Sequence, residues 1–117
     1  MTGILGRALN RMSHPDDEVE TLQEGVAKAG CESIASQRSR DVVMAHGTLR
    51  SVTLRPVDGV SWLEAELYDG STSLTVIWLG RRKIEGISCG RELTVHGRLG
   101  ERDGAKIMFN PRYELSA

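Results

Sequence analysis

The segment SWLEAELYDGSTSLTVIWL, from Ser61 to Leu79, predicts the β-hairpin on which the rest of the fold depends. Its first half alternates between two sets of residues, which is the period of a strand with one buried face. The set predicted to face inward is Leu63, Ala65 and Leu67, and the outward set is Trp62, Glu64, Glu66 and Tyr68. Asp69-Gly70-Ser71 consists of residue types that favour a turn. Ser73 to Leu79 predicts the second arm, and neighbouring strands must cover it because both of its faces become apolar.

Three further strands are predicted around this hairpin. The first extends from Val42 to Leu54, with Gly47 where a strand of a curled sheet must bend. The fourth extends from Glu92 to Leu99, and the fifth from Ala105 to Leu115 with an interruption at Pro111, which cannot donate to a β-ladder. In the fourth strand the inward set is Leu93, Val95 and Leu99, and the outward set is Thr94, His96 and Arg98. Five strands with a short helix or turn between the third and fourth predict an all-β, five-stranded OB-fold barrel.

An N-terminal helical extension is predicted before the barrel. A helix should begin near Ser13, with Pro15 in its first turn and acidic residues after it, and should end near Ala29 before Gly30. Its apolar stripe is Val19, Leu22, Val26 and Ala29. The predicted domains are therefore residues 1–40, the extension and linker, and residues 41–117, the barrel.

Composition limits the classes of function. The 117 residues suffice for one domain, and 15 Lys and Arg against 16 Asp and Glu give a net charge of −1, without a domain-wide basic field. No leader sequence or long apolar span is apparent, so we expect a cytoplasmic protein that does not enter a membrane. Cys31 and Cys89 are predicted to be free thiols, and neither they nor His46 and His96 have metal-ligand spacing.

The sequence does not predict an enzyme. Ser, His and Asp residues occur without a nucleophile-elbow motif, and neither cysteine has a neighbouring histidine. The segment from Gly80 to Gly86 lacks the Gly-Lys-Ser/Thr ending of a phosphate-binding loop. We therefore expect a non-catalytic binding module without a cofactor or a metal.

Four motifs carry a resemblance to a known superfamily. They are Gly47-Thr48-Leu49-Arg50-Ser51-Val52, Leu67-Tyr68-Asp69-Gly70-Ser71, Leu74-Thr75-Val76-Ile77-Trp78-Leu79 and Asn110-Pro111-Arg112-Tyr113-Glu114-Leu115. The chain resembles the OB-fold superfamily of class II tRNA synthetase anticodon-binding domains, and more closely the wedge domain of a branch-migrating DNA helicase. Over its whole length it is similar to small, single-domain actinobacterial OB-fold proteins that are assigned to nucleic-acid binding by their fold. This resemblance implies a ligand that is single-stranded or branched nucleic acid.

The candidate site residues are aromatic and cationic. OB-folds hold oligonucleotides on the surface of strands two and three and on the loops that join strands one to two and four to five. On that basis Arg55 is expected in the first loop, Arg102 in the second, and Trp62, Tyr68 and Thr75 on the face, although Glu64 and Glu66 share the face and would repel phosphate. The full set of candidate binding residues is Arg50, Arg55, Trp62, Tyr68, Arg81, Arg82, Lys83 and Arg102.

Two alternatives remain open from the sequence. The N-terminal helix could cover Trp62 and Tyr68, and the protein would then be a protein-interaction or self-association module that docks this helix on its own barrel or a partner's. Arg81, Arg82 and Lys83 could contact a phosphate, pair with Glu18, Glu20 or Glu24, or form a solvated basic turn. The position of the helix discriminates between nucleic-acid binding and protein interaction. Packed across strands two and three it closes the candidate face, and packed against the bottom of the barrel it leaves that face open.

Overall fold

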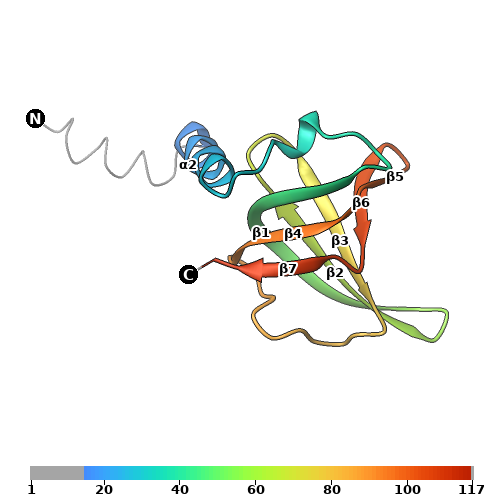
Figure 1. The fold of residues 1–117 in the computed structure, drawn as a ribbon. Coiled ribbons are helices and arrows are strands. Elements are labelled where there is room, and N and C mark those ends of the chain that lie inside the picture. Colours follow the sequence, from blue (N-terminus) through green and yellow to red (C-terminus); the bar gives the residue numbers. More distant parts are fainter. Residues whose placement is uncertain (1–14, 117) are drawn as a thin grey trace, which may run out of the picture.

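The computed structural model describes residues 15–116, which form one α-helix, one short 3-10 helix and one curled β-sheet (Figure 1). The elements are α2 (Pro15–Lys28), η1 (Ile34–Ser36), β1 (Val42–Val57), β2 (Val60–Tyr68), β3 (Ser73–Leu79), β4 (Glu92–Arg98), β5 (Gly100–Arg102), β6 (Ala105–Phe109) and β7 (Arg112–Leu115). The strand order is β5-β6-β3-β2-β1-β4-β7, and all neighbours are antiparallel except β3 and β6. A mostly-β chain with an N-terminal helix is thus confirmed. Within the described residues, no helix is long and apolar enough to cross a membrane.

The sheet has seven strands where the sequence predicts five. The predicted fourth strand ends as β4, and after Leu99 the chain continues as β5, while Asn110 and Pro111 divide the predicted fifth strand into β6 and β7. β6 pairs with β5 and with β3, whereas β7 pairs with β4. β4 and β5 are nearly continuous and form one arm of a hairpin, and β6 and β7 form the other arm. The pair β5–β6 stands at one end of the strand order and the pair β4–β7 at the other, so both ends come from this hairpin. The sheet therefore curls back on itself.

Two Asp-Gly turns place the strand ends differently from the prediction. Asp58 and Gly59 have φ angles of 49° and 79°, and Asp103 and Gly104 have 54° and 80°. Positive φ at both central residues is the geometry of the two-residue hairpin turn that Asp-Gly favours. β1 consequently extends to Val57, three residues beyond the predicted Leu54. The prediction that Arg55 and Arg102 lie in loops is wrong, because each belongs to a strand that runs up to such a turn.

The predicted bend in β1 lies where that strand changes partners. β1 pairs with β4 from Val42 to Thr48 and with β2 from Thr48 onward. A side chain at Gly47 would collide with the backbone of Tyr68, so the close approach of β2 requires a glycine at this position. The irregularity in the pairing falls slightly later, between Leu49 and Ser51.

The core lies inside the curl. Its buried members include the predicted inward sets of β2 and β4, which are Leu63, Ala65, Leu67, Leu93, Val95 and Leu99. Trp78 of β3 is also buried, and its indole Nε1 donates a hydrogen bond to the carbonyl oxygen of Pro111 at 3.0 Å. Ile34 of η1 is only 1% exposed and packs in the same cluster, although it comes from the segment predicted as an extension and linker. The division into domains at residue 40 stays a prediction.

Helix α2 packs mainly on β1 and also meets Glu92 at the start of β4 and Gly70 in the β2–β3 turn, but it does not lie across β2 and β3. The helix ends at Lys28, one residue before the predicted Ala29. Gly30 follows with a φ of 75°, and the Cys31 N–H donates to the carbonyl oxygen of Val26. Gly25 lies against His46 and Glu92, and Val26 is buried. The sequence predicts an outward-facing Thr94, but Thr94 is 8% exposed because this outer part of β4 is covered. The predicted helix start at Ser13 lies outside the described residues.

The segment between β3 and β4 contains turns rather than the short helix that the sequence allows. It follows β3 along the bottom of Figure 1, far from α2 at the top, and Ile84 and Ile87 insert from it into the core. Arg81, Arg82 and Lys83 precede these two residues and are exposed. No helix dipole therefore acts on the three cations.

Candidate functional site

A groove of about 530 Å³ lies on the outer face of β2, β3 and β6. Its lining residues are Arg55, Val57, Trp62, Glu64, Thr75, Ile77, Arg102, Asp103, Ala105, Lys106 and Ile107. The groove thus contains several of the residues that the sequence predicts for binding, namely Arg55, Trp62, Thr75 and Arg102. No residue of α2 lines it, so the described part of the helix leaves this region of the face open.

Trp62, which lines this groove, forms an aromatic pair with Phe109, which does not line it. Trp62 of β2 and Phe109 of β6 meet edge to face, with their ring centroids 5.9 Å apart, and Phe109 is 45% exposed. β3 separates the two strands, and Ile77 of β3 is in register both with Glu64 of β2 and with Phe109 of β6. Sequence analysis missed Phe109, because its position relative to Trp62 follows from the parallel pairing of β3 with β6. Its place in the sequence, as the last residue before Asn110-Pro111, gives no such signal.

The carboxylates on this face are engaged with neighbouring side chains. Arg55 Nη1 lies 3.3 Å from Glu64 Oε2, and Glu66 Oε1 accepts a hydrogen bond from the Ser73 hydroxyl at 2.8 Å. The Arg55 side chain is exposed and the Glu64 side chain is half-buried, so this solvent-accessible ion pair is weak. It nevertheless offsets the charge of Glu64 beside the groove, and it leaves the other donors of the Arg55 guanidinium available.

A second groove continues from the first one. It has a volume of about 450 Å³ and is lined by Arg40, Arg98, Leu99, Gly100, Glu101, Arg102, Ile107 and Phe109. The two grooves share Arg102 and Ile107. Arg98 donates from Nη1 to the backbone oxygen of Arg40, which fixes one edge of its guanidinium and joins the two arginines. Arg40 and Arg98 were not among the predicted binding residues, and only the folding of the linker against β4 brings them here.

The opposite end of β2 has a different environment. The Arg50 guanidinium lies 3.6 Å from the centre of the Tyr68 ring, and its Nη2 is 3.2 Å from Glu18 Oε1 of α2. A pocket of about 580 Å³ lies between the helix and these two residues. The sequence left open whether the helix covers Trp62 and Tyr68. In the structure the helix lies beside Tyr68 and away from Trp62.

The predicted cations of the β3–β4 segment are not brought to α2. Within residues 15–116 no ion pair joins Arg81, Arg82 or Lys83 to the helix, whose Glu18 pairs with Arg50 instead. Lys106 has a structural role, since its Nζ donates to the backbone oxygens of Ile34 and Gln37 at 2.6 and 2.7 Å. It therefore holds the linker against β6.

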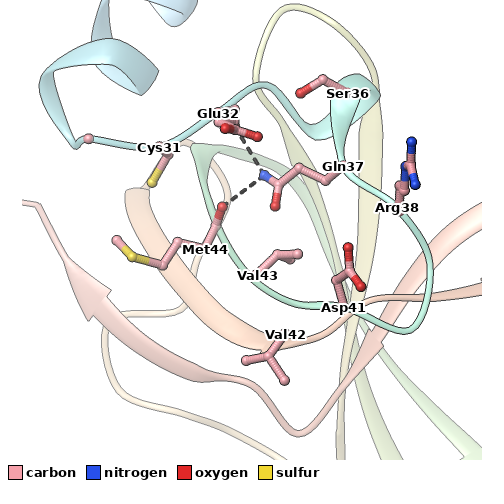
Figure 2. A pocket seen from close by; sticks show the side chains of 10 residues that line it. Cys31, Glu32, Ser36, Gln37, Arg38, Asp41, Val42, Val43 and Met44 are labelled. Carbon is pink, nitrogen blue, oxygen red and sulfur yellow. Dashed lines mark hydrogen bonds between the residues drawn. The ribbon is translucent and has the colours of Figure 1, made fainter.

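A further pocket, of about 700 Å³, lies between the α2–β1 linker and the start of β1 (Figure 2). The Gln37 side chain crosses it and donates to the backbone oxygens of Met44 and Glu32 at 2.9 and 3.1 Å. Burial raises the pKa of the Cys31 thiol at its edge, which lowers the reactivity of that thiol. These contacts hold the linker on the free edge of β1, and they bring together no group suited to chemistry.

A buried polar cluster lies beneath α2. His46 Nδ1 is 2.7 Å from Thr94 Oγ1, and His46 Nε2 is 2.6 Å from Glu92 Oε2. His46 and Thr94 are both buried, so the cluster satisfies polar groups at the helix–sheet contact. Within the described part of the chain no three His, Cys, Asp or Glu residues are placed to hold a metal ion.

The geometry has a parallel among solved structures. The structure of RecG bound to a three-way DNA junction contains a region of similar fold, with a TM-score of 0.53 and 18% sequence identity. Part of RecG is folded like this chain. The match covers 80% of this chain but only 16% of the RecG chain, and at this identity it shows the fold alone. No protein-family model matches the sequence, and no curated protein matches it either.

Proposed function

We propose that this chain is an OB-fold module that binds single-stranded or branched nucleic acid without catalysing a reaction, and that the two adjoining grooves, one lined by Trp62 and the other by Phe109, are its binding surface. One observation carries the proposal. The outer face of β2, β3 and β6 combines the half-buried Trp62 and the exposed Phe109 with arginines from β1, β4 and β5, and no residue of α2 lines its grooves. The seven observed strands come from five chain segments that curl on themselves, which fits the OB-fold.

The chemistry of the groove suits a nucleic-acid strand. Aromatic side chains stack on the faces of bases, which contributes about 1–3 kcal/mol per base. Arginine forks bind phosphate oxygens in a bidentate manner. Arg102 stands between the two grooves, with Arg55 at one side and the Arg40–Arg98 pair at the other. A strand whose bases contact Trp62 and Phe109 would have cations on both sides for its backbone.

The similarity to RecG gives this proposal its choice of ligand. The RecG structure contains a three-way DNA junction, and the matching region has the fold of this chain. We therefore propose branched DNA as a ligand beside a simple single strand. With a net charge of −1, the protein has no overall attraction for DNA, so binding should depend on the local cations and should be weak.

Fluorescence anisotropy at about 50 mM salt tests the proposal, with a labelled three-way DNA junction, a mixed-sequence single strand, a duplex and a single-stranded RNA as probes. Trp62→Ala should lower the affinity roughly 5- to 150-fold, because it removes about 1–3 kcal/mol of stacking. Leu54→Ala is the matched control, since Leu54 is 43% exposed but lies outside both grooves. Its affinity should equal that of the unmodified protein.

Two results would contradict the proposal. If none of the four probes binds, the nucleic-acid function is wrong. If Trp62→Ala and Leu54→Ala bind equally well, the groove is not the binding surface. Light scattering on the same samples addresses self-association through α2, the alternative that the sequence left open. A dimer that binds no nucleic acid would favour that alternative.

A further inference from the structure

Arg50 lies between an aromatic ring and a carboxylate, and a nucleic acid would offer it groups of the same two kinds. One face of its guanidinium lies 3.6 Å from the Tyr68 ring centre, and its Nη2 meets the Glu18 carboxylate at 3.2 Å. A base and a phosphate would present the same combination of an aromatic face and an anionic oxygen. The carboxylate of α2 therefore occupies the position that a phosphate oxygen would take on this arginine.

The helix around the Glu18–Arg50 contact is strongly acidic. α2 carries five acidic residues and one lysine, a net charge of −4, within 14 residues. The carboxylates of Asp17, Glu18, Glu20 and Glu24 border the pocket whose other wall contains Thr48, Arg50 and Tyr68. A phosphate that approached Arg50 would meet this negative field. The helix thus blocks the Tyr68 end of the outer face electrostatically, while the Trp62 end stays accessible.

The helix contact is also weak enough to be displaced. The Arg50 side chain is 45% exposed and the Glu18 side chain 60%, and exposed ion pairs of this kind are worth little. Trp62 and Tyr68 are the two ends of the part of β2 that pairs with β3, so a ligand that reaches both must span about 20 Å of strand. A strand already bound at Trp62 would then compete with Glu18 for Arg50 at a high local concentration.

We propose that α2 is an intramolecular competitor, in which Glu18 occupies Arg50 on Tyr68 and so withholds a second nucleic-acid contact from the surface around Trp62. This inference rests on the proposed function and adds its regulation. Longer ligands displace the Glu18 carboxylate, whereas short ones bind only at the groove. The helix sets how much of the outer face a ligand can use.

The test compares Glu18→Gln with Glu20→Gln in the full chain, by anisotropy with the three-way junction and the single strand. Both changes remove one negative charge from the exposed face of the same helix, but only Glu18 contacts Arg50. Glu18→Gln should raise the affinity about two- to fivefold, the range expected for an exposed ion pair. Glu20→Gln should raise it less, because it changes only the general field of the helix.

A double-mutant cycle with Arg50→Gln isolates the contact. In the Arg50→Gln background, Glu18→Gln should change the affinity as little as Glu20→Gln does, since the cation for which Glu18 and a phosphate compete is absent. The inference is overturned if Glu18→Gln and Glu20→Gln raise affinity equally, or if the Glu18 effect persists without Arg50. Both results leave the proposed function intact as long as Trp62→Ala still lowers binding. Absence of binding by the unmodified chain and by all variants overturns the function and the inference together.

Discussion

At the scale of single residues, Asp69 links the N-terminal segment to the sheet. Its side chain is only 1% exposed, and Oδ2 accepts the backbone N–H of Ile34 at 2.7 Å. Oδ1 accepts the N–H and the hydroxyl of Ser71, at 2.8 and 2.6 Å, and the N–H of Thr72 at 3.2 Å. The turn at Asp69-Gly70-Ser71 could be predicted from its residue types. The bond to Ile34 could not, because that residue lies 35 positions away.

We expect Asp69→Ala to lower the free energy of unfolding by about 2–4 kcal/mol, because the buried Ile34 N–H and the partly buried donors of Ser71 and Thr72 lose their acceptor. The measurement is the urea unfolding midpoint. Asp41→Ala is the control, since Asp41 is exposed and its side chain makes no hydrogen bond within residues 15–116, so its midpoint should barely move. A small effect of Asp69→Ala, equal to that of the control, would show that water replaces these bonds at little cost.

At the scale of elements, the segment from α2 to η1 is part of the fold rather than a separate appendage. Ile34 fills the core, Lys106 of β6 holds the backbone oxygens of Ile34 and Gln37, and α2 covers the His46–Thr94 cluster. Amphipathic spacing predicted the helix and its stripe. It did not predict that three residues of η1 would anchor the segment, because a single buried isoleucine has no periodic pattern.

Truncation to residues 41–117 should lower the thermal unfolding midpoint and promote association. The barrel strands should still fold, but the loss of Ile34 removes roughly 1.5–3 kcal/mol of burial and exposes the apolar surface beneath η1 and α2. Thermal unfolding with light scattering measures both effects.

Ile34→Ala in the full chain separates the core contribution from that of the helix. It should reproduce much of the loss in stability, about 2–5 kcal/mol, without the association. If the truncated protein matches the full chain in midpoint and in molecular mass, the N-terminal segment has no energetic role and the packing seen here does not stabilise the barrel.

At the scale of the whole molecule, the balance of charge limits how nucleic acid can be bound. The barrel region from 41 to 117 has ten cationic and ten acidic residues, so any attraction for phosphate must come from the few arginines that the fold gathers. The two grooves bring Arg40, Arg55, Arg98 and Arg102 to one face. The arrangement of these side chains, rather than their number in the sequence, creates the candidate site.

The salt dependence of single-strand binding should therefore be modest. With about 0.7 counterions released per phosphate contact, four arginines give a slope of log K against log salt no steeper than about −3. Anisotropy titrations at several salt concentrations measure it. Arg102→Gln should make the slope shallower by about 0.7, whereas Arg91→Gln, an exposed residue outside both grooves, should leave it unchanged. An equal change for both variants would mean that binding is diffuse and independent of the grooves.

Much of the fold could be predicted from the sequence, because it depends on local rules. The alternation of Leu63, Ala65 and Leu67 identified the inner face of β2, and Gly30 marked the end of α2. Pro111 marked the break between β6 and β7. These features follow from side-chain period and backbone dihedral preference, which act over a few residues.

The tertiary structure alone decided which faces are covered and which cations meet. Thr94 belongs to the outward set of β4, yet it is buried because α2 packs on β1 over His46, the hydrogen-bond partner of Thr94. Phe109 joins Trp62 only because β6 runs parallel to β3, and Arg50 meets Glu18 only because the helix docks at the Tyr68 end of β2. Such contacts arise from the packing of segments far apart in the chain. Local propensity sets the shape of each segment, whereas the candidate site depends on how those segments are brought together.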